Sequence, residues 1–150
     1  MPETVYDAMG GADAVLALAH AWHERVLADP VVSHAFSHGF RDDHTERLAA
    51  YWVEQLGGPP AYTTGLGDQS HVVRLHSGNG EHHEMDERAV ECLVRALDDA
   101  GLPTDPTLRA TLTAWFRWGI GLMDAHPDSA DDVPDGLALP RWTWDGPASG

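Results

Sequence analysis

Apolar residues recur at helical spacing along four long stretches of the chain, and glycine or proline ends each stretch. No segment of useful length alternates apolar and polar residues, so the pattern indicates an all-α chain. Asp43 and Glu46 resemble a capping box, in which the Asp43 side chain would cap a helix. The predicted helices cover residues 5–9, 12–28, 43–56, 85–100 and 106–125, with a single short turn at 31–36.

Residues 61–84 carry no long periodic segment, although they are not purely polar. Within them, Val72, Val73 and Leu75 form a short apolar turn that ends at His76, and a loop of small residues follows. A stretch this long without regular structure inside a small domain is usually functional or disordered. Because this one contains apolar residues, we expect an ordered segment that wraps around another group.

His76 is the candidate metal ligand of this segment. A histidine held in this way can place one ring nitrogen on a metal and leave the other for a backbone carbonyl. Such a ligand suits a haem iron, which globins hold by one proximal histidine. The plainer alternative is that His76 is only a residue at the end of a helix.

The charge balance argues against two classes of partner. The chain has 150 residues, enough for one domain with a sizeable core, and 9 Lys and Arg stand against 24 Asp and Glu. The formal charge of -15 disfavours nucleic acid and anionic membranes, and no stretch approaches the roughly 18 apolar residues of a membrane span. The single cysteine, Cys92, and the absence of a visible signal peptide predict a cytoplasmic protein.

A second group of metal-ligating residue types is the tetrapeptide Glu81-His82-His83-Glu84. Consecutive residues on a helix point apart, so a solvated helix start is the favoured interpretation and a divalent-metal site is the alternative. The chain shows no nucleophile elbow, no P-loop, no dinucleotide-binding glycine motif and no Glu-x-x-His pair of a di-iron bundle.

A haem site also needs an apolar slot, an aromatic side chain against the porphyrin and a polar group on the distal side. Phe36 can pack flat on the ring. Leu48 follows His44 by about one helical turn, so a helix that places Leu48 over the iron places His44 at the pocket edge. His23 lies next to the core residue Trp22 and could point into the same cavity.

With these residues in their order, the chain resembles the truncated, two-over-two haemoglobins, and among them group II most closely. The resemblance covers about residues 3–125. The residues that carry it are the glycine pairs Gly10-Gly11 and Gly57-Gly58, then Val5-Tyr6-Asp7-Ala8, Arg47-Leu48, Pro59, Tyr62, Phe36 and Arg74-Leu75-His76.

The resemblance implies a globin-like two-over-two helical sandwich with haem b as its iron cofactor. It implies His76 as the proximal ligand and Phe36 and Leu48 as haem contacts. Arg47 and Tyr62 become candidate partners of the haem propionates. Residues 1–125 would form the truncated globin domain. Residues 126–150 would form a C-terminal extension packed on the body, since a solvated tail rarely carries two tryptophans.

Three positions depart from the family pattern and make the distal pocket atypical. His23 stands where the second helix of group II proteins carries a distal Tyr. Val90 is the best match to the position of a Trp over the haem, and His44 stands where many members have a small residue. The resemblance therefore leaves open how a bound ligand is stabilised.

We predict a haem protein that binds O₂ or another diatomic ligand at an iron held by His76. His23, His44 or both would donate a hydrogen bond to that ligand. Two alternatives stay within the haem class: peroxide, NO or O₂ redox turnover, and six-coordinate iron with His23 or His44 as the second axial ligand. A reductase partner and the oligomeric state are left open. The alternative of another class is a haem-free globin-like interaction domain or divalent-metal-binding domain.

Overall fold

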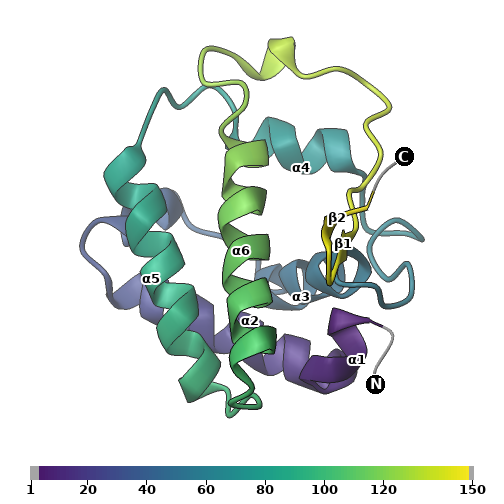
Figure 1. Cartoon of the computed structure of the whole chain (residues 1–150). Helices are drawn as coiled ribbons and strands as arrows, with labels where there is room; N and C mark the ends of the chain where they lie inside the picture. Colours follow the sequence, from purple (N-terminus) through teal and green to yellow (C-terminus); the bar gives the residue numbers. More distant parts are fainter. Residues whose placement is uncertain (1–3, 149–150) are drawn as a thin grey trace.

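The computed structural model describes residues 4–148 and shows an all-α fold, as the apolar periodicity predicted (Figure 1). Two 3₁₀ helices, η1 (Val32–Phe36) and η2 (Ala130–Asp132), and a two-stranded hairpin, β1 (Trp142–Thr143) with β2 (Gly146–Pro147), complete it. The α-helices are α1 (Val5–Met9), α2 (Gly11–Ala28), α3 (His44–Gln55), α4 (Gln69–His76), α5 (His83–Asp99) and α6 (Pro106–Met123).

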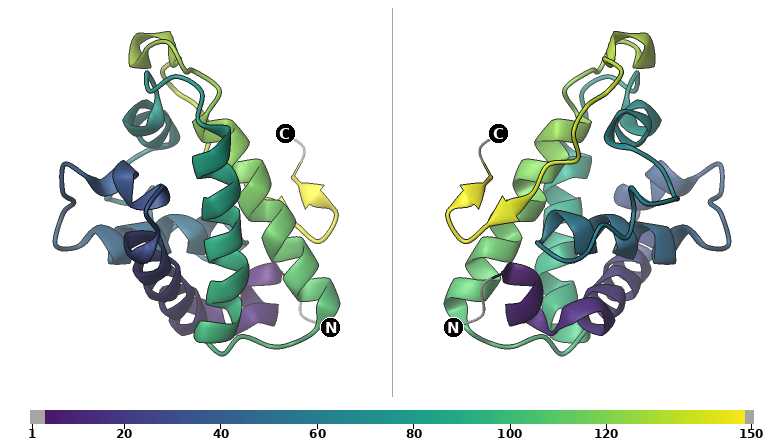
Figure 2. Two further views of the ribbon diagram at one scale, coloured as in Figure 1. Left: turned by 90° about the vertical axis from the view of Figure 1, so that its left-hand side faces the viewer. Right: turned by 90° about the vertical axis from the view of Figure 1, so that its right-hand side faces the viewer.

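The helices α2, α3, α5 and α6 stack as two pairs. α2 packs on both α3 and α5, and α5 packs beside α6, so the α5/α6 pair lies over the α2/α3 pair (Figures 1 and 2). Trp52 of α3 meets Trp22 of α2 within its own pair and Trp115 and Phe116 of α6 across the pairs, all edge to face, with ring centroids 5.2–6.0 Å apart. Such aromatic contacts add to the burial energy and fix the two layers against each other.

The second glycine pair explains how the end of α3 fits against α1. Gly57 has a φ of 102°, which only glycine adopts readily, and the backbone N–H of Tyr6 donates to the carbonyl of Leu56 at 2.9 Å. A Cβ on Gly58 would lie 2.7 Å from Val53 Cγ1 and 2.9 Å from the Tyr6 ring. Both glycines are therefore required by the close approach of these two helices.

α4 corrects the expectation of no regular structure between residues 61 and 84. The Asp68 side chain accepts a hydrogen bond from the His71 backbone N–H at 2.8 Å, which caps the first turn. The prediction that the Asp43 side chain caps α3 was wrong, because its carboxylate accepts instead a hydrogen bond from the Arg41 guanidinium at 2.8 Å.

The segment after α6 runs back over the body. Figure 2 shows it passing along α6 to the hairpin of β1 and β2. Trp142 is buried and its indole N–H donates to Thr111 Oγ1 at 3.0 Å. Within residues 4–148, no helix is both long enough and apolar enough to cross a membrane.

We expect Gly58→Ala to lower the free energy of unfolding by about 1–3 kcal/mol, because the new methyl group overlaps Val53 and Tyr6. Urea unfolding measures the change. Gly65→Ala is the matched control, since a Cβ there meets nothing within 4 Å. Equal effects of the two substitutions would contradict the steric argument.

Candidate functional site

His76 is the last residue of α4, and its ring is held by its own helix. His76 Nδ1 lies 2.8 Å from the backbone carbonyl oxygen of Val72, which places the ring proton on Nδ1 and leaves the Nε2 lone pair free. His76 keeps part of its surface exposed, but the protein atoms packed around it desolvate the ring and lower its pKa in spite of the opposing bond to Val72. His76 is therefore a neutral imidazole in the form that binds metals.

Four rings from different elements form an aromatic–histidine cluster: His23 of α2, Phe36 of η1, Phe40 of the following loop and His44 of α3. The His23 ring centroid lies 5.0 Å from that of Phe36, 4.7 Å from Phe40 and 4.9 Å from His44. The structure thus brings His23 and His44, which the sequence analysis assigned to the distal side, together with Phe36, which it assigned to the haem ring.

The cluster contains two buried nitrogens that lack a hydrogen-bond partner within residues 4–148, His23 Nε2 and His44 Nδ1. Burial lowers the pKa of both histidines, and for His44 the nearby His23 and His76 rings lower it further. Buried polar atoms are nearly always paired, so two orphans in one cluster point to a group that would meet them. His23 Nδ1 lies 3.4 Å from the Thr45 hydroxyl, which can donate to it and leave the proton on Nε2.

The other predicted site residues lie on α3, on α5 and in the loop after α3. Leu48 is half-buried, one turn after His44, and Val90 is buried on α5. The Arg47 guanidinium donates to the Leu66 carbonyl at 2.8 Å. Tyr62 is buried and its ring stacks edge to face on Tyr51.

Sequence reasoning missed two residues that shape this region. Phe40 lies in the loop after η1, and its one signal in the sequence is that it stands four residues after Phe36. Glu54 is buried on α3 and accepts hydrogen bonds from the backbone N–H groups of Tyr62 and Thr63 at 3.1 and 2.9 Å. No apolar periodicity marks a buried glutamate, so its role in fixing the loop was not visible.

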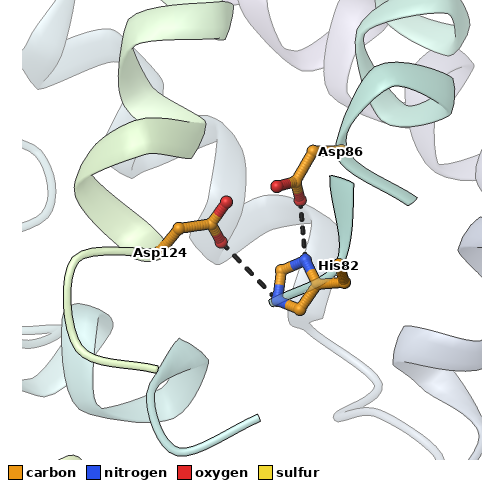
Figure 3. Close-up of side chains that lie close together, drawn as sticks. All are labelled: His82, Asp86 and Asp124. Carbon is orange, nitrogen blue, oxygen red and sulfur yellow. Dashed lines mark hydrogen bonds and ion pairs between the residues drawn. The ribbon is translucent and has the colours of Figure 1, made fainter. Parts of the chain in front are cut away.

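The tetrapeptide Glu81-His82-His83-Glu84 does not converge on one point. The Glu81 and His83 side chains are exposed, whereas His82 turns inward and faces Asp86 of α5 and Asp124, the residue that follows α6 (Figure 3). Burial and the neighbouring Asp86 carboxyl raise the pKa of Asp124 to about 7.

The stacked helix pairs define a globin-like fold. A model of the bacterial-like globin family matches residues 4–115, so the chain belongs to that family. Two curated relatives are group 1 truncated haemoglobins. The one from Tetrahymena pyriformis is 27% identical over 101 residues, which are 67% of this chain and 79% of the relative. The one from Synechocystis sp. is 29% identical over 104 residues, 68% of this chain and 82% of the relative.

Solved structures of group II truncated haemoglobins share the fold. The group II protein of Bacillus anthracis superposes with a TM-score of 0.71 at 21% identity, over 86% of this chain and 96% of its own. A haemoglobin of Thermobifida fusca gives a TM-score of 0.65 at 25% identity, over 89% and 99% of the two chains. The predicted resemblance to truncated haemoglobins and the predicted globin-like fold are therefore confirmed.

Membership of a globin family implies a haem with its iron as the cofactor. The residues present fit that group. His76 offers a neutral ring nitrogen, Phe36 and Leu48 offer half-buried apolar surface, and the two orphaned histidine nitrogens face no protein partner among the residues described.

The raised pKa of Asp124 predicts a pH-dependent effect of Asp124→Asn, measured in the presence of a chelator. Between its ordinary value of 3.8 and about 7, Asp124 holds its proton in the folded chain but not in the unfolded one. Its contribution to stability is therefore full at low pH and is lost as the pH rises through about 7. Relative to the parent chain, the free energy of unfolding of the variant should rise by about 1 kcal/mol between pH 5 and pH 8. The change is this small because the partial exposure of Asp124 screens the effect. Urea unfolding at both pH values measures this, and a pH-independent difference would contradict it.

Proposed function

We propose that this globin binds haem b through His76 and that the bound iron takes O₂ or another diatomic ligand. The observation that carries the proposal is the 2.8 Å contact between His76 Nδ1 and the Val72 carbonyl. It fixes the tautomer and the ring orientation, and it leaves Nε2 as the metal-binding atom. When bound, the haem supplies an iron with an open coordination position for a small ligand.

The chain's own part on the distal side would be played by His23 and His44. Both rings are neutral near pH 7 because burial lowers their pKa, and a neutral imidazole still has one N–H to donate. Phe36 and Phe40 pack against both histidines and would keep water away from them. A hydrogen bond to the ligand from either histidine is worth roughly 1 kcal/mol.

Arg47 and Tyr62 are the proposed partners of the haem propionates. Arg47 uses one N–H on the Leu66 carbonyl, and its guanidinium carries further donors for a carboxylate. The Tyr62 hydroxyl lies beside Gly67, where a Cβ would approach it to 2.7 Å. Val90 and Leu48 would supply apolar surface to the macrocycle.

The proximal role is tested by adding haemin to the parent chain, His76→Gly and His71→Gly. His71 is an exposed histidine of the same helix, so its glycine variant carries a similar helix-propensity cost of about 1 kcal/mol. We expect a sharp Soret band in the parent and in His71→Gly. In His76→Gly the band should be lost or shifted, and added imidazole should restore it.

An unchanged Soret band in His76→Gly would refute the assignment of the ligand. If haemin gives no Soret shift with any of the three proteins, the haem-free alternative of a globin-like interaction or metal-binding domain is favoured.

The distal role is tested by His23→Leu and His44→Leu in the ferrous protein. Loss of a hydrogen bond worth roughly 1 kcal/mol should speed O₂ dissociation about fivefold for the residue that donates. Stopped-flow displacement of O₂ by CO measures the rate. His34→Leu, an exposed residue of η1, is the control. If O₂ dissociates from a variant that carries both substitutions, His23→Leu and His44→Leu, as slowly as from the parent, neither histidine is a donor.

A further inference from the structure

Three side chains at the start of α5 and the end of α6 converge outside the site proposed for haem. His82 precedes α5, Asp86 lies in the first turn of α5, and Asp124 follows α6. One ligand-type atom from each residue lies within 4.8 Å of the other two. Figure 3 shows the His82 ring between the two carboxylates, with one nitrogen toward each.

The two contacts of the His82 ring differ in length, and only the shorter one is a direct hydrogen bond. Nδ1 lies 2.8 Å from Asp86 Oδ1, which is the length of a hydrogen bond that orients the ring. Nε2 lies 3.6 Å from Asp124 Oδ1, which is too long for a direct hydrogen bond. Two ligands at about 2.0–2.2 Å from one tetrahedral cation are separated by about 3.4 Å, so this gap matches two atoms that share a metal.

The surroundings of the site favour a cation. Asp124 stands at the C-terminal end of α6, where the helix dipole adds negative charge beside two carboxyl groups. Among the residues described, Asp86 and Asp124 have ion-pair contacts only with His82.

We propose that His82, Asp86 and Asp124 form a binding site for a divalent transition-metal cation of the zinc class. His82 Nε2 and Asp124 Oδ1 are its ligands, Asp86 orients the imidazole through Nδ1–H, and water completes the shell. One imidazole with carboxylate oxygen suits Zn²⁺ better than Mg²⁺ or Ca²⁺, which prefer all-oxygen shells. The side chains are partly exposed, so an ion can reach them.

The site joins two places that the fold already holds together. The Gly78 and Gly80 backbone N–H groups donate to the carbonyls of His126 and Pro127, each at 2.9 Å. A metal at His82 and Asp124 would fasten the start of α5 to the end of α6 beside this pairing. Because the unfolded chain lacks the site, Zn²⁺ should stabilise the fold.

The experiment titrates Zn²⁺ alone into the chelator-treated, full-length, haemin-incubated protein by calorimetry. We expect one Zn²⁺ per chain at this site, with affinity at least about tenfold lower in Asp124→Asn and in His82→Asn. Asparagine is a good residue at the N-cap position of His82, so the helix should persist. His83→Asn is the control, because that neighbouring side chain is exposed, and its affinity should stay within about twofold of the parent.

A second readout separates binding from folding: Zn²⁺ should raise the melting temperature of the parent and of His83→Asn but not of Asp124→Asn. Unchanged affinity in both Asp124→Asn and His82→Asn would overturn the proposal. So would loss of binding in His83→Asn alone, which would assign the metal to the exposed tetrapeptide instead. The comparison does not depend on haem, because failure to take up haemin leaves the ranking of the variants unchanged.

Discussion

The position of α4 depends on a chain of buried hydrogen bonds. An eight-residue helix is too short to be stable alone, so the helix that ends at His76 takes its place from its neighbours. Trp115 Nε1 donates to Gln55 Oε1 at 3.2 Å, the Gln55 amide donates to the Tyr51 hydroxyl, and Tyr51 donates to Gln69 Oε1 at 2.6 Å. Because these groups are buried, breaking one link leaves a polar atom unpaired at a cost of about 1–3 kcal/mol. α6 and α3 thereby hold the first turn of α4.

The segment after α6 holds α4 from the other side. The Ser70 hydroxyl donates to the Pro134 carbonyl at 2.8 Å and accepts from the Leu137 backbone N–H at 3.1 Å. Arg74, two residues before His76, donates to the Val133 carbonyl at 3.1 Å. Residues 133–137 therefore contact two successive turns of α4, the helix that ends at His76. Under the proposed function, the segment after α6 would help to position the helix that carries the haem ligand.

Apolar periodicity was enough to predict the long helices and the stacked architecture, because each of them repeats its stripe several times. α4 has only eight residues, and it buries Gln69 and Ser70 as well as valines, so no stripe was visible. The sequence named the aromatic–histidine cluster except Phe40, which joins it only through the path of a loop. Asp124 could not be linked to His82 either, because only the packing of α5 beside α6 brings them together.

The aromatic–histidine cluster is electrically unlike the rest of the chain. None of its four side chains contributes to the chain's formal charge of -15. Burial keeps its two imidazoles neutral because it lowers their pKa. The nearby His23 and His76 rings lower the pKa of His44 further. Charging either ring would require desolvating a cation beside another histidine. A neutral pocket with N–H donors favours a neutral, polarisable ligand over an anion, whose charge would find no countercharge there. The resemblance places His23 and Val90 where group II members carry a Tyr and a Trp, so under the proposed function His23 and His44 would be the chain's own hydrogen-bond donors to such a ligand.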